Sequence, residues 1–339
     1  MNHLCRLFFL IALLEPTFAD EKLIESVEND PITRIAFGSC LKNPQEGLIM
    51  ERIVEYKPDV FIWLGDNIYV DTNDKPERFS ELYKTLGKNP RFQKLRKTCP
   101  NLAIWDDHDY GNNNRDQSYP LKKEAKQAFA TFWKIPENSA VWKRSGIYRA
   151  HEYGPENQRV QIILLDGRWN LDKRNPKDPD SYLGAEQWAW LEKVLKRPAR
   201  VRLICSGVQV IKINNVGKNW EMWGHHPTER ARLLDLIETN KTNGVIFISG
   251  DMHVAEIFRT EDTIYPLYDV TASGMDVVHP KSGSTKQGPF EQVGQTLIDR
   301  NFGGIQINWA GDPKISLELI NGKGEKSITH EISLSEISY

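Results

Sequence analysis

Short apolar runs recur along the chain and are separated by longer stretches of mixed polarity. The runs are rich in Val, Ile, Leu and Phe and are short enough to be buried β-strands. They are Arg34–Phe37, Val60–Leu64, Leu102–Trp105, Val160–Leu165, Val201–Cys205 and Val245–Ile248. Stretches with helical spacing of apolar residues lie between them, at Glu46–Tyr56, Leu121–Trp133, Ala185–Lys196 and Thr228–Thr242, with a weaker one at Ser80–Leu86. This alternation predicts an α/β fold in which helices cover the faces of a sheet.

The C-terminal part of the chain has a different pattern. Apolar runs follow one another there without helical stretches between them, at Leu267–Val270, Gly304–Trp309, Ile315–Leu319 and Ser327–Ile332. We therefore expect a second sheet, packed on or beside the first. The polar segments Asp172–Pro179 and Val278–Phe290 are interpreted as exposed loops and not as domain boundaries. A single domain is predicted over residues 31–339.

The first residues are typical of a targeting segment. Arg6 precedes the apolar run Leu7–Leu14, and small residues stand before a cleavage site at Ala19. This pattern predicts a signal peptide over 1–19, followed by an N-terminal extension over 20–30, and hence a secreted or periplasmic protein. A frayed apolar terminus is the alternative. The run is too short to span a bilayer, and no other segment predicts a transmembrane helix.

The net charge of the chain bears on its partners, and its cysteine content bears on disulfide formation. The formal net charge is −2 over 339 residues, and without a basic excess no nucleic-acid partner is indicated. Loss of the signal peptide would leave Cys40, Cys99 and Cys205, an odd number in an exported protein. Cys99 and Cys205 could pair in an oxidising compartment. Cys205 lies within a predicted strand, however, which favours a buried free thiol. The oligomeric state is not predicted.

Polar and metal-binding side chains follow each predicted strand of the first group. The segments are Gly38–Cys40, Gly65–Asp71, Asp106–Asp109, Asp166–Arg168, Ser206–Gln209 and Gly250–His253. The carboxyl ends of strands form the edge of an α/β sheet at which ligands bind. Acidic groups gathered there would repel one another unless cations or a substrate balanced them.

The clustered side chains have the chemistry of metal ligands. The candidates are Asp66, Asp107, His108, Asp251 and His253, with Cys40 and Tyr69 as softer ones. Carboxylate and imidazole together suit transition metals, and thiolate and phenolate add a preference for iron or zinc over magnesium. Surplus carboxylates could also hold a hard ion such as calcium. A single Asp or His would be interpreted as a cap or a surface group, but the series at successive strand ends predicts a site.

Five ordered motifs carry a more specific resemblance. They are Phe37–Cys40 (FGSC), Trp63–Tyr69 (WLGDNIY), Trp105–Asp109 (WDDHD), Leu164–Arg168 (LLDGR) and Ser249–His253 (SGDMH). With these motifs the chain resembles the alkaline phosphatase D (PhoD-like) family of the calcineurin-like metallophosphoesterases, from about Ile32 to Asp269. The resemblance implies a sandwich of two packed mixed sheets flanked by helices, with a metal site at the C-terminal ends of strands.

The resemblance also implies which residues hold metals. It implies an iron site with Cys40, Asp66 and Tyr69, and a second site, calcium in the family, that shares Asp66 and uses Asp107. Asp251 and His253 would complete the metal shell. Zinc and manganese are the alternative metals. The implied substrate is a small phosphate ester.

The expected activity is that of a secreted, metal-dependent phosphoric-ester hydrolase of the alkaline phosphatase type. A metal-bound hydroxide would attack phosphorus, and His108 would donate a proton to the leaving oxygen as general acid. The alternative for His108 is that it only orders Asp66 or Asp107 through a hydrogen bond. Arg168 is expected to contact phosphate, with an ion pair to Asp166 as the alternative.

Two further residues are candidates for substrate binding. Asn112 follows the third motif, although runs of Asn are usually turns. His226 precedes Pro227, and a role at the start of a helix is equally consistent with that position.

Other activities are weighed against this interpretation. The alternative within the family is a phosphodiesterase or a phospholipase D-type hydrolase of lipid or glycerol phosphodiesters. A serine esterase is disfavoured because no Gly-x-Ser-x-Gly occurs at a strand–helix turn. A non-catalytic metal- or carbohydrate-binding module would have no need of His108 beside surplus carboxylates.

Overall fold

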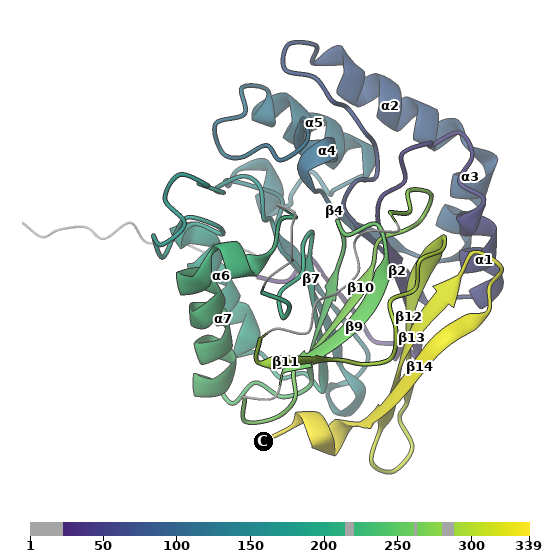
Figure 1. Cartoon of the computed structure of the whole chain (residues 1–339), viewed down its shortest axis with the longest axis vertical. Coiled ribbons are helices and arrows are strands. Elements are labelled where there is room, and N and C mark those ends of the chain that lie inside the picture. The colour runs from purple at the N-terminus through teal and green to yellow at the C-terminus, as the bar shows by residue number, and fades with distance from the viewer. Residues whose placement is uncertain (1–22, 214–219, 261–262, 280–287) are drawn as a thin grey trace, which may run out of the picture.

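The structure is a computed structural model of the chain and describes residues 23–213, 220–260, 263–279 and 288–339 (Figure 1). The predicted signal peptide over 1–19 lies outside the described residues, as does 280–287 in the predicted loop Val278–Phe290. Part of the predicted extension over 20–30 is a strand. No helix in the described ranges combines the length and the apolar character needed to cross a membrane.

Helices and strands alternate through the first two thirds of the chain. The helices are α1 (Ile49–Tyr56), α2 (Glu77–Lys88), α3 (Pro90–Thr98), α4 (Asp107–Tyr110), α5 (Lys122–Phe132), α6 (Ala185–Leu195) and α7 (Pro227–Thr239). The strands are β1 (Ser26–Glu28), β2 (Arg34–Gly38), β3 (Val60–Leu64), β4 (Asn101–Ile104), β5 (Arg149–Tyr153), β6 (Val160–Leu164), β7 (Val201–Ser206), β8 (Val245–Ser249), β9 (Ala255–Thr260), β10 (Tyr268–Ala272), β11 (Phe290–Gln292), β12 (Asn301–Asn308), β13 (Lys314–Asn321) and β14 (Lys326–Ser333).

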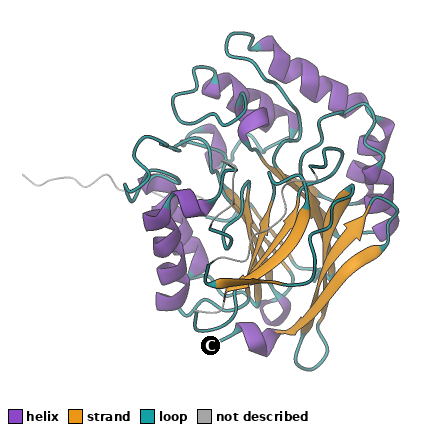
Figure 2. Ribbon diagram, in the orientation of Figure 1, coloured by secondary structure: helices purple, strands orange, loops and turns teal. Residues whose placement is uncertain are grey.

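The strands form two mixed sheets. The eight-stranded sheet has the order β1-β5-β6-β7-β8-β10-β9-β11, and the six-stranded sheet has the order β14-β13-β12-β2-β3-β4. In Figure 1, α6 and α7 lie to the left of the strands and α1 to α3 lie to the right. Figure 2 shows the strands gathered in the middle of the molecule, with helices on the outside. The predicted sandwich of two mixed sheets flanked by helices is confirmed.

Burial on both faces explains why the central strands read as apolar runs. Every residue of β3, β6, β7 and β8 is buried. β2, β3 and β4 pair in parallel in one sheet, and β6, β7 and β8 pair in parallel in the other. Parallel strands covered on both sides need apolar residues at successive positions, not only at alternate ones.

The expected division of the strands between two sheets was wrong. The C-terminal strands do not form a separate sheet, because β12 pairs with β2 and extends the sheet of β2, β3 and β4. β10 instead pairs with β8 in the eight-stranded sheet. The strands predicted as one N-terminal sheet are therefore split between the two sheets, and C-terminal strands complete both. Such pairings join segments far apart in the chain, which local patterns do not reveal.

Several elements have no apolar signature in the sequence. β5 has the sequence RAHEY and is nonetheless fully buried, because its Glu152 is paired with Arg197 and its Arg149 donates to backbone carbonyls. α3 has a mostly polar sequence and starts at an Asn89 cap followed by Pro90. The predicted helix Glu46–Tyr56 begins only at Ile49.

The predicted loop Asp172–Pro179 and the predicted free thiol of Cys205 are both found in the structure. Asp172–Pro179 contains no helix or strand, as predicted for a loop. Cys40, Cys99 and Cys205 are all free and buried. Cys99 and Cys205 are therefore not joined by a disulfide, in agreement with the interpretation of Cys205 as a buried thiol.

Candidate metal centre

The carboxyl ends of strands from both sheets meet at one place. β2, β3 and β4 bring Cys40, Asp66 and Asp107 from the six-stranded sheet, and β8 is followed by Asp251 and His253. The contact between the sheets is close at Gly250, where a Cβ would lie 2.7 Å from Ser39 Oγ and 2.9 Å from the Leu64 carbonyl oxygen. Only glycine allows this approach of two strand ends.

Three groups of candidate ligands form at this junction. The groups are Cys40 with Asp66 and His253, Asp66 with Asp107 and His108, and Asp106 with Asp107 and Asp251. Within each group the ligand atoms lie within 4.8 Å of one another. Asp66 belongs to two groups and so does Asp107, so the three groups adjoin. The first and third combine residues of both sheets.

The backbone at the site is strained. Four of the candidate ligands have positive φ angles, namely Cys40 (64°), Asp66 (52°), Asp251 (67°) and His253 (56°). Such conformations are uncommon for residues other than glycine and persist only where the surrounding structure imposes them. The turns after β2, β3 and β8 thereby aim ligand atoms at a common point.

Asp66 lies at the centre of the hydrogen bonding. The Cys40 thiol donates to Asp66 Oδ2 over 3.5 Å, and the Tyr69 hydroxyl donates to the same oxygen over 3.0 Å. The backbone N–H of His108 donates to Asp66 Oδ1 over 3.4 Å and to Asp107 Oδ1 over 2.9 Å. The predicted ligands Cys40, Asp66, Tyr69 and Asp107 are therefore direct neighbours.

The buried carboxylates of the cluster favour a compensating positive charge. Burial, followed by the charges of Asp107 and Asp106, raises the pKa of Asp66 well above its usual value. Burial and the same neighbours raise the pKa of Asp251. The buried Asp251 Oδ2 has no hydrogen-bond partner among the described residues. A cation would relieve this repulsion and satisfy this oxygen, so the donor set fits a metal.

His253 and Cys40 complete this donor set. Burial and the nearby charge of His108 lower the pKa of His253 to about 4, which keeps the imidazole neutral, as a metal ligand must be. Burial and Asp66 raise the pKa of the Cys40 thiol. A bound soft cation would lower the pKa of this thiol, because a thiol that coordinates a metal is deprotonated.

His108 is positioned by a carboxylate that the sequence motifs did not single out. Its Nδ1 lies 2.5 Å from Asp71 Oδ1, and its ring packs on Tyr69 with 4.1 Å between ring centroids. Burial lowers the pKa of His108, but the hydrogen bond to Asp71 and the charge of Asp107 outweigh it and raise the pKa above its ordinary value. Since a carboxylate only accepts hydrogen bonds, Nδ1 carries the proton and Nε2 is the nitrogen left for the site.

Arg168 places a buried positive charge beside the acidic residues of the cluster. Its Nε donates to Asp106 Oδ1 over 2.6 Å, and its Nη1 donates to Glu221 Oε2 over 2.6 Å. The side chain is 2% exposed. The alternative ion pair with Asp166 is not formed by the side chain, since only the backbone N–H of Arg168 contacts that carboxylate. The guanidinium therefore balances the carboxylate of Asp106 in the cluster.

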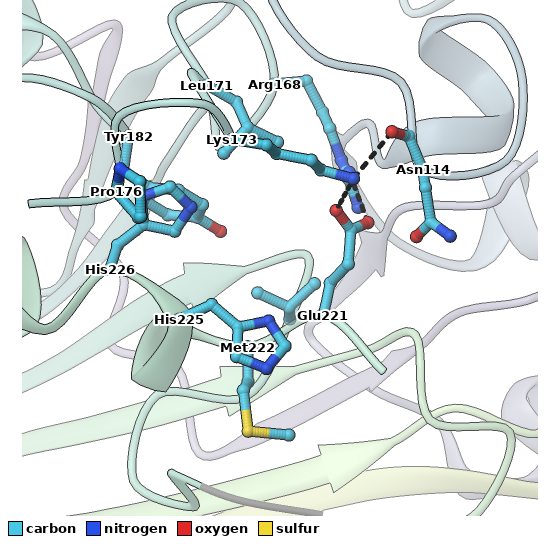
Figure 3. A pocket seen from close by; sticks show the side chains of 11 residues that line it. Asn114, Arg168, Leu171, Lys173, Pro176, Tyr182, Glu221, Met222, His225 and His226 are labelled. Carbon is cyan, nitrogen blue, oxygen red and sulfur yellow. Dashed lines mark hydrogen bonds and ion pairs between the residues drawn. The ribbon is translucent and has the colours of Figure 1, made fainter. Parts of the chain in front are cut away.

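Two adjoining cavities open beside the ligands. One of about 320 Å³ is lined by His108, Asn113, Asn114, Trp220, Glu221, Asp251 and His253. The other, of about 430 Å³, lies next to it, shares Asn114 and Glu221, and is also lined by Arg168 and His226 (Figure 3). Asn112 lines neither cavity, and its side chain accepts a hydrogen bond from the backbone of Asn113 in a turn.

His226 lies in the wall of the second cavity and also precedes α7. Its Nδ1 is 3.1 Å from Ser181 Oγ, and its ring contacts Tyr182 with 5.1 Å between centroids. Burial and the neighbouring His225 lower its pKa to about 4. His226 therefore presents a neutral ring to the cavity.

Sequence reasoning left out several residues of this site. Asp106 stands in the WDDHD motif, but only Asp107 and His108 of that motif were predicted as site residues. Asp71 follows β3 closely, and that position was its only signal. Glu221 and Trp220 lie in no motif, and only the fold brings them to the cavities.

We expect Gly65→Ala to destabilise the protein and to displace Asp106. Gly65 has a φ of +98°, and a Cβ there would lie 2.5 Å from Asp106 Cβ and 2.8 Å from its backbone nitrogen. Gly311→Ala is the matched control, because Gly311 has a φ of +63° but open space around the missing Cβ. We expect about 1 kcal/mol of lost unfolding free energy at Gly311 and about 3 kcal/mol or more at Gly65, measured by urea denaturation. Equal losses would contradict the described packing.

We expect Arg168→Met to lower the free energy of unfolding by about 3–5 kcal/mol, because it leaves Asp106 and Glu221 without their shared cation. Burial already raises the pKa of Asp106 to about 8. The control is Arg174→Met, which removes a 77% exposed side chain from its pair with Asp172 and is expected to cost at most about 1 kcal/mol. Urea unfolding followed by circular dichroism measures both, and similar small losses would refute the counter-charge role of Arg168.

Comparisons with known proteins agree with this geometry. A model of the PhoD-like phosphatase family matches residues 35–301. Alkaline phosphatase D of Bacillus subtilis (strain 168) is 21% identical over 334 residues, which cover 83% of this chain and 56% of that protein. The chain thus spans little more than half the length of this relative.

Solved structures show the same fold at low identity. The structure of PhoD matches with a TM-score of 0.67 at 16% identity, covering 90% of this chain and 69% of that one. Purple acid phosphatase PPD1 from seeds of yellow lupin (Lupinus luteus) matches with a TM-score of 0.60 at 14% identity, covering 90% of this chain and 54% of that one. These likenesses show that the chain shares the fold of PhoD and of purple acid phosphatase PPD1. Because the family model spans most of the sequence, the chain belongs to the PhoD-like phosphatase family.

Proposed function

We propose that the protein is a metal-dependent phosphoric-ester hydrolase. The observation that carries this proposal is the set of three overlapping ligand groups at the strand ends, in which Asp66 and Asp107 are each shared. Carboxylates shared between adjoining groups fit a centre of two metals, and such centres act on phosphate esters. The family membership supports the same class of reaction.

For the metals we propose iron and calcium, as the family resemblance implies. Cys40, Asp66, Tyr69 and His253 would hold the iron, since thiolate, phenolate and imidazole suit it. Asp66, Asp107 and Asp251 would hold the calcium, which prefers carboxylate oxygens. When bound, the metals lower the pKa of water and neutralise charge on the phosphoryl oxygens.

The chain's own groups account for proton transfer. We propose His108 as the general acid that protonates the leaving alcohol, because its ring lines the cavity and Asp71 fixes its tautomer. Contacts to Asp66 and Asp107 come from the His108 backbone and not from its ring. Replacement of the ring would therefore leave these two backbone contacts in place.

We propose different roles for Arg168 and Asn112 from those expected from the sequence, and we keep His226 as a substrate-binding residue. Since Asp106 and Glu221 engage the guanidinium of Arg168, we propose that it positions these carboxylates and does not contact phosphate itself. Asn114, which lines both cavities, would take the substrate-facing place that was expected for Asn112. His226 would contact the organic part of the substrate in the second cavity.

Phosphodiesters are the second candidate substrates. The cavity of about 320 Å³ at the cluster adjoins another of about 430 Å³, which gives room for an organic group on each side of a phosphodiester. A phosphodiesterase, including one of the phospholipase D type, is therefore consistent with the site.

Hydrolysis of 4-nitrophenyl phosphate and bis(4-nitrophenyl) phosphate by the purified protein tests the proposal. We expect hydrolysis of at least one ester, loss of the activity after chelation, and its return when iron and calcium are added back. The preferred ester decides between the two candidates. A metal-loaded protein that hydrolyses neither would refute the hydrolase proposal.

We also propose export, on the pattern of Arg6, Leu7–Leu14 and Ala19. N-terminal sequencing of the protein from its native cell is then expected to start at Asp20, and a protein that retains Met1 would refute cleavage at this site.

A further inference from the structure

The cavity of about 430 Å³ has a charge arrangement that bears on substrate choice. It adjoins the candidate metal centre through two shared lining residues, Asn114 and Glu221. A phosphoryl group at the metal ligands would therefore direct one of its substituents into this cavity. Its walls include apolar side chains, among them Leu171, Val208 and Met222.

Glu221 stands at the boundary between the two cavities and engages the cations of the second one. Its carboxylate pairs with Arg168 Nη1 at 2.6 Å and with Lys173 Nζ, as the dashed lines in Figure 3 show. Lys173 Nζ also donates to the backbone carbonyl of Asn114 over 2.7 Å. Arg168 reaches away from the cavity to Asp106.

The cations of this arrangement are already paired. Arg168 and Lys173 both pair with Glu221, and Arg168 pairs with Asp106 as well. The imidazoles of His225 and His226 add no charge at neutral pH, because burial lowers the pKa of both. Among the described residues that line the cavity, each cationic side chain already has an acidic partner. A second anionic group of a substrate would thus meet no free cation and would face the Glu221 carboxylate.

We propose that this cavity binds the organic group of the ester and that Glu221 determines its specificity, selecting uncharged groups over anionic ones. The inference rests on the proposed phosphoric-ester hydrolase function and deepens it by naming a substrate class. Esters of neutral alcohols are preferred, and esters with a further carboxylate or phosphate on the alcohol are disfavoured.

The test compares phenyl phosphate with 4-carboxyphenyl phosphate, which differ by one negative charge on the organic group. The measured quantity is the ratio of kcat/KM for the two substrates. Comparing this ratio between each variant and wild type cancels the intrinsic difference in reactivity between the substrates. In Glu221→Gln we expect the relative kcat/KM of the carboxylated substrate to rise on the order of tenfold, because one nearby repulsive charge is removed. In Lys173→Met, which leaves Glu221 less neutralised, we expect a shift in the opposite direction.

Binding provides a readout that does not depend on turnover. In calorimetric titrations of metal-loaded protein with phenylphosphonate and 4-carboxyphenylphosphonate, we expect the relative affinity for the carboxylated ligand to rise in Glu221→Gln and to fall in Lys173→Met. Glu156→Gln, an exposed carboxylate in neither cavity, is the control and should leave both ratios unchanged.

The outcomes separate the inference from the function on which it rests. If wild type hydrolyses neither phosphate, the proposed function fails, and the phosphonate Kd values still report on Glu221. Ratios that stay within twofold of wild type in both variants, or that move in the same direction, overturn the inference. If Glu221→Gln does not fold, Lys173→Met decides alone by the sign of its shift, since Lys173 is 33% exposed and its replacement is expected to leave the fold intact.

Discussion

Asp66→Asn is expected to abolish metal binding at the centre and to lower kcat/KM by about 10³-fold or more. Asp66 belongs to two of the three ligand groups, with Cys40 and His253 on one side and Asp107 and His108 on the other. An amide keeps the shape of the side chain but removes its negative charge, so both proposed metals lose a ligand at once. Elemental analysis and hydrolysis of a chromogenic phosphate ester measure the two effects.

Asp109→Asn is the matched control for this experiment. Asp109 lies at a neighbouring strand end and is 1% exposed, like Asp66, but it belongs to none of the described ligand groups. Its carboxylate accepts hydrogen bonds from the backbone N–H groups of Asn67 and Asp106. We expect Asp109→Asn to lower stability while the folded protein keeps its metal. Equal metal loss in both variants would show that Asp66 acts only through the fold.

His108→Asn is expected to lower kcat/KM by about 10²–10⁴-fold on alkyl phosphate esters. The effect should be much smaller on 4-nitrophenyl esters, because nitrophenolate leaves without needing a proton. Steady-state kinetics on a series of leaving groups measures this difference. Asp71→Asn should act in the same direction but less strongly, since Asp71 only holds Nδ1 of the ring.

The same series distinguishes the alternative role of His108. If the residue served only to order Asp66 or Asp107, its contribution would come from the backbone N–H, which donates to both carboxylates. That contact survives replacement of the side chain. A uniform loss of activity across all leaving groups would therefore contradict general acid catalysis by the ring.

The parts of the fold that the sequence predicts are those with a local signal. Parallel strands buried on both faces, such as β3 (Val60–Leu64) and β8 (Val245–Ser249), appear as continuous apolar runs. β5 has no such run because Arg149 and Glu152 are buried together with their hydrogen-bond partners. The assignment of strands to sheets depends on distant pairings such as β12 with β2, for which the sequence holds no local signal.

The residues of the candidate site also divide into those with a signal in the sequence and those without one. Candidate ligands at strand ends, such as Asp66 and Asp251, could be predicted because the position itself implies convergence. Glu221 could not, because it lies outside every motif and reaches Arg168 only through the folding of the chain. Asp71 contacts His108 because a turn with a φ of 45° redirects the chain after β3, and that turn has no sequence signature.

Elemental analysis of the purified protein, paired with hydrolysis before and after chelation, tests the central claim that the strand-end cluster is a metal centre. The account predicts about two metal ions per chain in wild type, iron with calcium, and a parallel loss of metal and activity on chelation. It also predicts metal-deficient, inactive protein for Asp66→Asn. A wild-type protein that contains no metal and hydrolyses phosphate esters at an undiminished rate in the presence of chelator would contradict it.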